Sequence, residues 1–77
     1  MAPLQVVLVG PLRRYVQGQE LISLDDWSGH TVFELLERLG VPSRMVAAAM
    51  LDGRMVRKSQ VLNEGEELKL IPVLGGG

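Results

Sequence analysis

The sequence predicts a two-layer α+β fold, in which a sheet of four or five strands carries one main helix on one face. Three observations lead to this expectation. Five short apolar runs are separated by glycine, proline and Asp or Asn turn signals. One amphipathic segment of helical period falls between the second and third runs. The chain has 77 residues, which is the size of a single domain, 1–77.

The first two strands are expected at residues 4–9 and 20–24. The run 4–9 hardly alternates between apolar and polar residues, which is typical of a strand that is buried on both faces. Gly10 and Pro11 end this run, and a connection that closes at Gly18 leads to the second one. We expect the two strands to form a hairpin.

The helix is expected at residues 32–39, where apolar residues recur at i, i+3, i+4 and i+7 and form one stripe. Thr31 stands at the N-cap position and Glu34 three residues later, which is the pattern of a capping box. Gly40 suits a left-handed C-terminal cap, and Pro42 prevents continuation. The stripe consists of Val32, Leu35, Leu36 and Leu39.

The remaining strands are expected at residues 46–51, 54–57 and 68–73. Three consecutive alanines within 46–51 favour a helix by propensity, but Asp52-Gly53 follows at once. Because this dipeptide is a strong signal for a type I′ hairpin turn, we predict a strand pair across it. Pro72 has no N–H, so it must face an unpaired edge or mark the end of its strand.

Composition excludes several kinds of function. The net charge is −1, so long-range attraction to nucleic acid or to an anionic membrane is not expected. The chain has no cysteine and one histidine, His30, so disulfides, cysteine-ligated metals and histidine-rich metal sites are excluded. The longest apolar run has six residues, and no cationic, apolar leader precedes the first strand. We therefore expect a soluble, cytoplasmic protein.

Three glycines, Gly75, Gly76 and Gly77, close the sequence directly after the last predicted strand. A frayed terminus is the plain interpretation, and we expect a flexible tail at 75–77. A tail without Cβ atoms is also slender enough to thread a narrow enzyme channel. Its carboxylate, with a reference pKa of about 3.3–3.7, is ionised at neutral pH. Adenylation by ATP would activate it, and sulfur transfer to the carbonyl would then give a thiocarboxylate.

Three segments together resemble the MoaD/ThiS family of ubiquitin-like sulfur-carrier proteins, and the resemblance covers nearly the whole chain. Residues 29–36, GHTVFELL, look like the start of the family's helix, and residues 63–73, NEGEELKLIPV, look like its final turn and strand. Residues 74–77, LGGG, look like its terminal diglycine. The late turn has Gly65-Glu66 where the family usually has Gly-Asp, which keeps the charge. The resemblance implies a β-grasp fold.

The resemblance also implies a carrier that is not an enzyme and that binds no cofactor stably. Gly77 would be the site of adenylate and thiocarboxylate attachment, and Gly75 and Gly76 would thread the tail. The implied partners are an ATP-using adenylating enzyme of the ubiquitin-activating type and a sulfurtransferase or desulfurase donor. The acceptor would be the large subunit of molybdopterin synthase or a thiazole synthase. No catalytic or metal-binding residue is implied in the chain itself.

Three further side chains are candidates for docking to a partner: Leu74 and Val73, beside the tail, and Phe33, off the apolar stripe of the helix. Phe33 could equally cover the region of Trp27. Five of the eight basic residues form either a docking patch for an acidic partner or a solvated face. They are Arg13, Arg14, Arg54, Arg57 and Lys58.

The connection at 10–18 looks more like that of the molybdopterin carriers than the shorter connection of the thiamine carriers. We therefore favour sulfur donation for molybdopterin, or tungstopterin, over thiamine thiazole. A ubiquitin-like protein modifier, joined to lysine through Gly77, is an alternative. A passive interaction module, for which the glycines have no role, is another.

Overall fold

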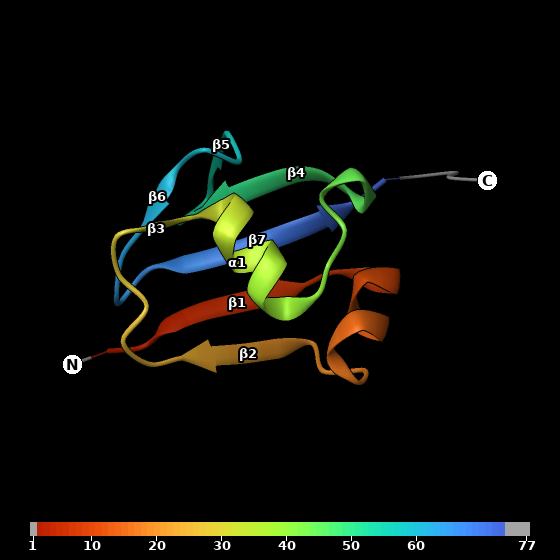
Figure 1. Ribbon diagram of the computed structural model, residues 1–77, viewed down its shortest axis with the longest axis horizontal. Helices are drawn as coiled ribbons and strands as arrows, with labels where there is room; N and C mark the ends of the chain where they lie inside the picture. The colour runs from red at the N-terminus through yellow and green to blue at the C-terminus, as the bar shows by residue number, and fades with distance from the viewer. Residues whose placement is uncertain (1, 74–77) are drawn as a thin grey trace.

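The computed structural model describes residues 2–73 and has two layers, a mixed sheet and one α-helix on one face of it (Figure 1). Leu74 and the predicted tail, 75–77, lie outside the described residues. The elements are β1 (Leu4–Leu8), η1 (Gly10–Val16), β2 (Leu21–Leu24), β3 (His30–Thr31), α1 (Val32–Leu39), η2 (Ser43–Met45), β4 (Val46–Leu51), β5 (Arg54–Val56), β6 (Val61–Leu62) and β7 (Glu67–Pro72), where η1 and η2 are 3₁₀ helices.

The main sheet has five strands in the order β2-β1-β7-β4-β5. β1 and β2 pair antiparallel, as the predicted hairpin requires, and β4 pairs antiparallel with both β5 and β7. β1 and β7, from the two ends of the chain, pair in parallel at the centre, with Val6 opposite Leu68. β3 and β6 form a separate two-stranded sheet. This central parallel pair inside a mixed sheet, with one α-helix across it, confirms the predicted fold class.

The prediction of α1 is confirmed at both ends. The Thr31 hydroxyl accepts a hydrogen bond from the Glu34 backbone N–H at 3.2 Å, and the Glu34 carboxylate accepts one from the Thr31 N–H at 2.8 Å. Gly40 has a φ of 77°, the left-handed conformation expected of a C-terminal cap. Local sequence therefore sets the length of this helix, because both ends are satisfied within a few residues.

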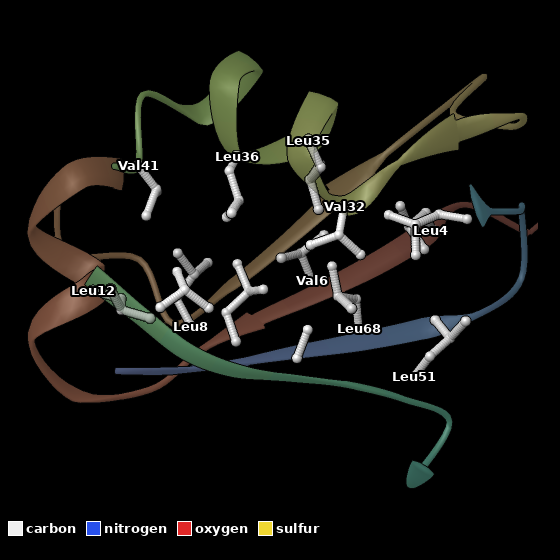
Figure 2. Packing of buried hydrophobic residues seen from close by; sticks show 14 of the residues in the cluster. Leu4, Val6, Leu8, Leu12, Val32, Leu35, Leu36, Val41, Leu51 and Leu68 are labelled. Atoms are coloured by element: carbon white, nitrogen blue, oxygen red, sulfur yellow. The ribbon is translucent and has the colours of Figure 1, made fainter. Parts of the chain in front are cut away.

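The core lies between α1 and the face of the sheet that α1 covers (Figure 2). α1 contributes three residues of the predicted stripe, while Leu39 is only partly buried. β1 contributes Leu4, Val6 and Leu8, which are fully buried, whereas Gln5 and Val7 between them are half-buried. The prediction that this strand is buried on both faces is therefore wrong. No helix of the described residues covers the second face of the sheet, so the strand alternates after all (Figure 1).

The ambiguous segment 46–51 is a strand, as predicted, and the alanines do not form a helix. Asp52 and Gly53 have φ angles of 48° and 85°, the two positive values that a type I′ turn requires. Pro72 is the last residue of β7, so its missing N–H interrupts nothing. The elements that were not predicted, η1, η2, β3 and β6, are short and have no repeated pattern.

Replacing the N-cap residue should destabilise the whole domain. We expect Thr31→Ala to lower the free energy of unfolding by about 1 kcal/mol, because the N–H of Glu34 loses its acceptor. Thr31→Ser keeps the hydroxyl and is the matched control. Urea denaturation measures both variants, and equal stability of the alanine and serine variants would contradict the role given to the cap.

The capping box should also make stability depend on pH. The pKa of Glu34 lies below its usual value of 4.5, first because its carboxylate accepts the Thr31 N–H and second because His30 lies beside it. A lowered folded pKa means that the carboxylate stabilises the fold above the ordinary value and stops doing so as the pH falls through the folded pKa. Wild type should have a higher free energy of unfolding than Glu34→Gln near neutral pH, and we expect this difference to disappear in that acidic range. Urea titrations at a series of pH values test this, with Glu37→Gln on the same helix as the control. A difference in free energy of unfolding that stays constant with pH would contradict this prediction.

Candidate functional site: the end of the domain where the chain leaves β7

The candidate site is the end of the sheet where β7 finishes, between η1 and η2 (Figure 1). Because β1 and β7 are parallel, the residues that follow both strands lie at the same end. η1 follows β1, and η2 precedes β4, which is antiparallel to β7, so both short helices stand beside the end of β7. We call this end, formed by residues 9–18, 43–45 and 70–73, the exit end.

Two backbone hydrogen bonds and one close approach fix the chain at the exit end. The Val73 N–H donates to the Met45 carbonyl of η2 at 3.1 Å, and the Val9 N–H donates to the Leu70 carbonyl at 3.2 Å. Gly10 has a φ of 58°, and a Cβ there would lie 3.8 Å from Cγ of Pro72. The chain is therefore held on both sides up to the last described residue, and it leaves from a defined place on a rigid strand.

The predicted docking residues within the described part of the chain are exposed. Leu70, next to the exit, is by contrast fully buried and belongs to the core. Val73 is 39% exposed, so its side chain is available to a partner. The other predicted tail residues, Leu74, Gly75, Gly76 and Gly77, lie outside the described residues. Among the predicted site residues, Val73 is thus the one that the structure places directly at the exit.

Phe33 is 51% exposed, which confirms that it lies off the buried stripe. Its N–H donates to the carbonyl of Lys58, in the β5–β6 loop, at 3.0 Å, and the Lys58 Nζ in turn donates to the Ser43 carbonyl of η2 at 2.7 Å. The Trp27 ring has other neighbours: the ring of His30 at 4.9 Å between centroids, and the guanidinium of Arg38 at 5.8 Å. Phe33 is therefore an exposed side chain beside the β5–β6 loop, whereas the Trp27 ring packs on His30 and Arg38.

The basic residues that were considered as one patch divide between the two ends of the sheet, and the Lys58 ammonium lies at the exit end, where it donates to the Ser43 carbonyl of η2 at 2.7 Å. Arg13 and Arg14 are exposed on η1, where the Arg13 Nε donates to the Gly10 carbonyl at 3.2 Å. Arg54 is opposite Leu51 in the β4–β5 pair, next to the turn at the other end of the sheet. Arg44, on η2, is exposed at the exit end and was not singled out from the sequence. A shallow hollow at this end is lined by Gly10, Pro11, Arg13, Arg14 and Gly18.

The open face of the sheet is partly apolar, which the sequence did not predict. Leu21 is 56% exposed on β2 and Met55 72% exposed on β5. They stand at the two ends of one row of side chains that crosses the strands. The row exists only because of the order of the strands in the sheet, and no local sequence pattern predicts that order. The row runs through Leu21, Val7, Lys69, Met50 and Met55.

His30 is a surface residue that takes part in the helix cap, and its Nδ1 lies 3.3 Å from the Glu34 carboxylate. Across residues 2–73, no three His, Cys, Asp or Glu side chains gather as metal ligands would. Within the same residues, no helix has both the length and the apolar character needed to cross a membrane.

Comparison of the whole fold with solved structures gives close matches at low sequence identity. The crystal structure of SAMP1 from Haloferax volcanii has a TM-score of 0.71 at 21% identity, covering 99% of this chain and 100% of the other. The Haloferax volcanii HVO 2177 protein has a TM-score of 0.69 at 23% identity, covering 99% and 87%. The complex of subunits 1 and 2 of the molybdopterin-converting factor from Helicobacter pylori 26695 contains a chain with a TM-score of 0.59 at 20% identity, covering 96% and 97%. At these identities the likeness shows the fold.

The sequence itself carries the family assignment. No curated protein matches the chain. The model of the ThiS family matches residues 6–77, which begin within β1 and include every later element and the closing glycines. The chain therefore belongs to the ThiS family and has its ubiquitin-like β-grasp fold.

Proposed function

We propose that this protein is a sulfur carrier whose working group is the carboxylate of Gly77. The observation that carries the proposal is the exit end, where contacts to η1 and η2 fix β7 up to Val73. The four residues that follow, LGGG, belong to the segment that the ThiS family model matches. A carrier needs this combination of a rigid body and a slender end, because the partner must grip the body while the end enters its active site.

The chemistry proceeds at the terminal carboxylate in balanced steps. A carboxylate oxygen of Gly77 attacks the α-phosphorus of ATP, and pyrophosphate leaves, which gives an acyl-adenylate. A persulfide on the donor attacks the carbonyl, and AMP leaves, which gives an acyl disulfide. A thiol of the donor or activating enzyme then cleaves the S–S bond, so that a disulfide forms and the thiocarboxylate is released. The chain has no cysteine, so it has no side-chain thiol on which to carry a persulfide instead.

In this scheme the protein is a co-substrate, and its partners supply the catalysis. An adenylating enzyme of the ubiquitin-activating type binds ATP, and a sulfurtransferase or desulfurase supplies the persulfide. The contribution of this chain is to present one carbonyl in a defined orientation, which converts a bimolecular encounter into a positioned reaction. Val73 and Leu74 seat the tail, while Gly75 and Gly76 leave room around it for the walls of the channel.

We propose molybdopterin, or tungstopterin, as the product that receives the sulfur. Support comes from the connection 10–18, which is long enough to form the seven-residue η1 beside the exit. A protein of the same fold from Helicobacter pylori is found in a complex of the two subunits of molybdopterin-converting factor. By analogy, the acceptor enzyme would be the large subunit of a molybdopterin synthase, with a thiazole synthase as the alternative.

Intact mass spectrometry tests the proposal directly. We expect that ATP, a persulfide donor and the cognate adenylating enzyme replace one terminal oxygen of the protein by sulfur. A variant without Gly76 and Gly77 is the control and should not change in mass. An unchanged wild-type mass, with an enzyme that is active on another carrier, would contradict the proposal. A ladder of lysine conjugates that depends on Gly77 would instead favour the protein-modifier alternative.

A bulky residue added after Gly77 should abolish sulfur transfer without affecting folding. The added side chain would block the channel and move the reacting carbonyl away from its position. We expect an unchanged urea midpoint and no thiocarboxylate, measured on the same preparation. A variant with one further glycine after Gly77 moves the terminal carbonyl without adding a side chain. It therefore separates the effect of side-chain bulk from the effect of the carbonyl's position. Full activity of the bulky extension, with the extra residue still present in the mass spectrum, would contradict the threading role.

A further inference from the structure

The charges of the molecule are separated along the direction of its central strands. The exit end carries three exposed arginines, Arg13 and Arg14 on η1 and Arg44 on η2. Residues 9–18, 43–45 and 70–73, which form the exit end, include no aspartate or glutamate, and an acidic residue beside them is Glu20, whose carbonyl accepts from the Leu8 N–H at 2.8 Å. The exit end is therefore positively charged wherever the pH is near neutral, because arginine stays protonated.

The opposite end of the sheet is acidic. Here β1 and β7 begin and β2 ends, as the pairs Gln5–Glu67 and Leu4–Leu24 show. The turn after β4 joins this end, because the Asp52 N–H donates to the Glu67 carbonyl at 2.9 Å. The segments that meet there are residues 24–26, 51–54 and 63–67. They contain six acidic residues and one arginine, Arg54. The acidic residues are Asp25, Asp26, Asp52, Glu64, Glu66 and Glu67.

The net charge of −1 conceals this dipole. Within residues 2–73, no ion pair joins Arg13, Arg14 or Arg44 to a carboxylate, and the one contact between a basic nitrogen and a carboxylate is between His30 and Glu34. The three guanidinium groups thus keep their charge open to a partner. Charges so arranged give a molecule a preferred orientation as it approaches a charged surface.

We propose that the exit end docks on an acidic rim around the channel of the adenylating enzyme that receives the tail. This inference rests on the proposed function. As the carrier approaches, the charge separation orients it so that its tail faces the channel. The acidic opposite end is repelled by the same rim. The interaction acts mainly on the rate of association, as is usual for exposed charges at the edge of an interface.

The reach of the tail argues for a protein surface rather than a bound nucleotide as the partner of these arginines. Four residues separate Val73 from the far end of Gly77, and an extended chain of four residues spans at most about 14 Å. When Gly77 is at the reacting phosphate, the arginines at the root of the tail are left at the mouth of the channel. A carboxylate-lined rim is what guanidinium groups at that place would pair with.

The test is the kinetics of adenylation by the cognate enzyme, measured by ATP–pyrophosphate exchange. We expect the double variant Arg14→Gln and Arg44→Gln to lower kcat/KM about tenfold at low salt, within the range by which charge steering raises association rates. The value of kcat at saturation should stay unchanged, because the tail still reaches the reacting phosphate. The difference should disappear towards about 1 M salt, where the Debye length is only about 3 Å.

Arg54→Gln is the matched control, since it removes one exposed charge from the opposite end, and it should leave kcat/KM at or above the wild-type value. An unchanged kcat/KM in the double variant would overturn the proposal. An increase would overturn it as well, and would indicate that the arginines hold the protein's own terminal carboxylate. Absence of any exchange with wild type would count against the proposed function instead.

A titration without the enzyme tests separately whether the exit end binds acidic groups. We expect hexaglutamate to shift the backbone amide resonances of η1 and η2 in NMR spectra, and hexalysine to shift those of residues 63–67. The double variant should lose the hexaglutamate response and keep the other. Shifts at the acidic end with hexaglutamate, or none at the exit end, would overturn the proposal that this end recognises an acidic surface.

Discussion

The parallel pairing of β1 with β7 is the constraint on which the remaining structure depends. It joins the two ends of the chain at the centre of the sheet, so the outer strands are added as antiparallel neighbours on either side. Its inward residues, such as Val6 and Leu68, are fully buried beneath α1. Burial of apolar area on this scale is the main stabilising term of a domain that has no disulfide. The same pairing points both strands towards one end, which is where the chain leaves.

The helix α1 and the exit end are stabilised in different ways. α1 is bounded locally by the Thr31–Glu34 capping box and by Gly40, so its length is set before any tertiary contact forms. Its apolar stripe then covers only one face of the sheet, which leaves the other face half-exposed. η1 and η2 have no side-chain cap hydrogen bond, and they pack against the end of β7. The site is therefore a product of packing on the central strands.

This arrangement suits a protein that partner enzymes bind and modify. The body offers a fixed exit, an arginine-bearing end and a partly apolar sheet face, while in the proposed function the reacting group belongs to the terminal glycines. Recognition and chemistry are thus separated in space. A partner can select the carrier by surface charge and shape and still treat the tail as a uniform substrate. ThiS-family membership supplies the context for this interpretation, and the charge separation is a property of this chain's own residues.

The sequence by itself determined the elements that depend on neighbouring residues. These are the capped helix, the Asp52-Gly53 turn, and strand positions correct to within one residue at either end, together with the glycine tail as the candidate reactive end. Only the tertiary structure decided the strand order, the one-sided burial of β1 and the separation of Arg54 from Arg13 and Arg14. The physical reason is that caps and turns are satisfied within a few residues, whereas pairing of strands from opposite ends of the chain depends on which apolar faces can be buried together. No local pattern in the sequence records that choice.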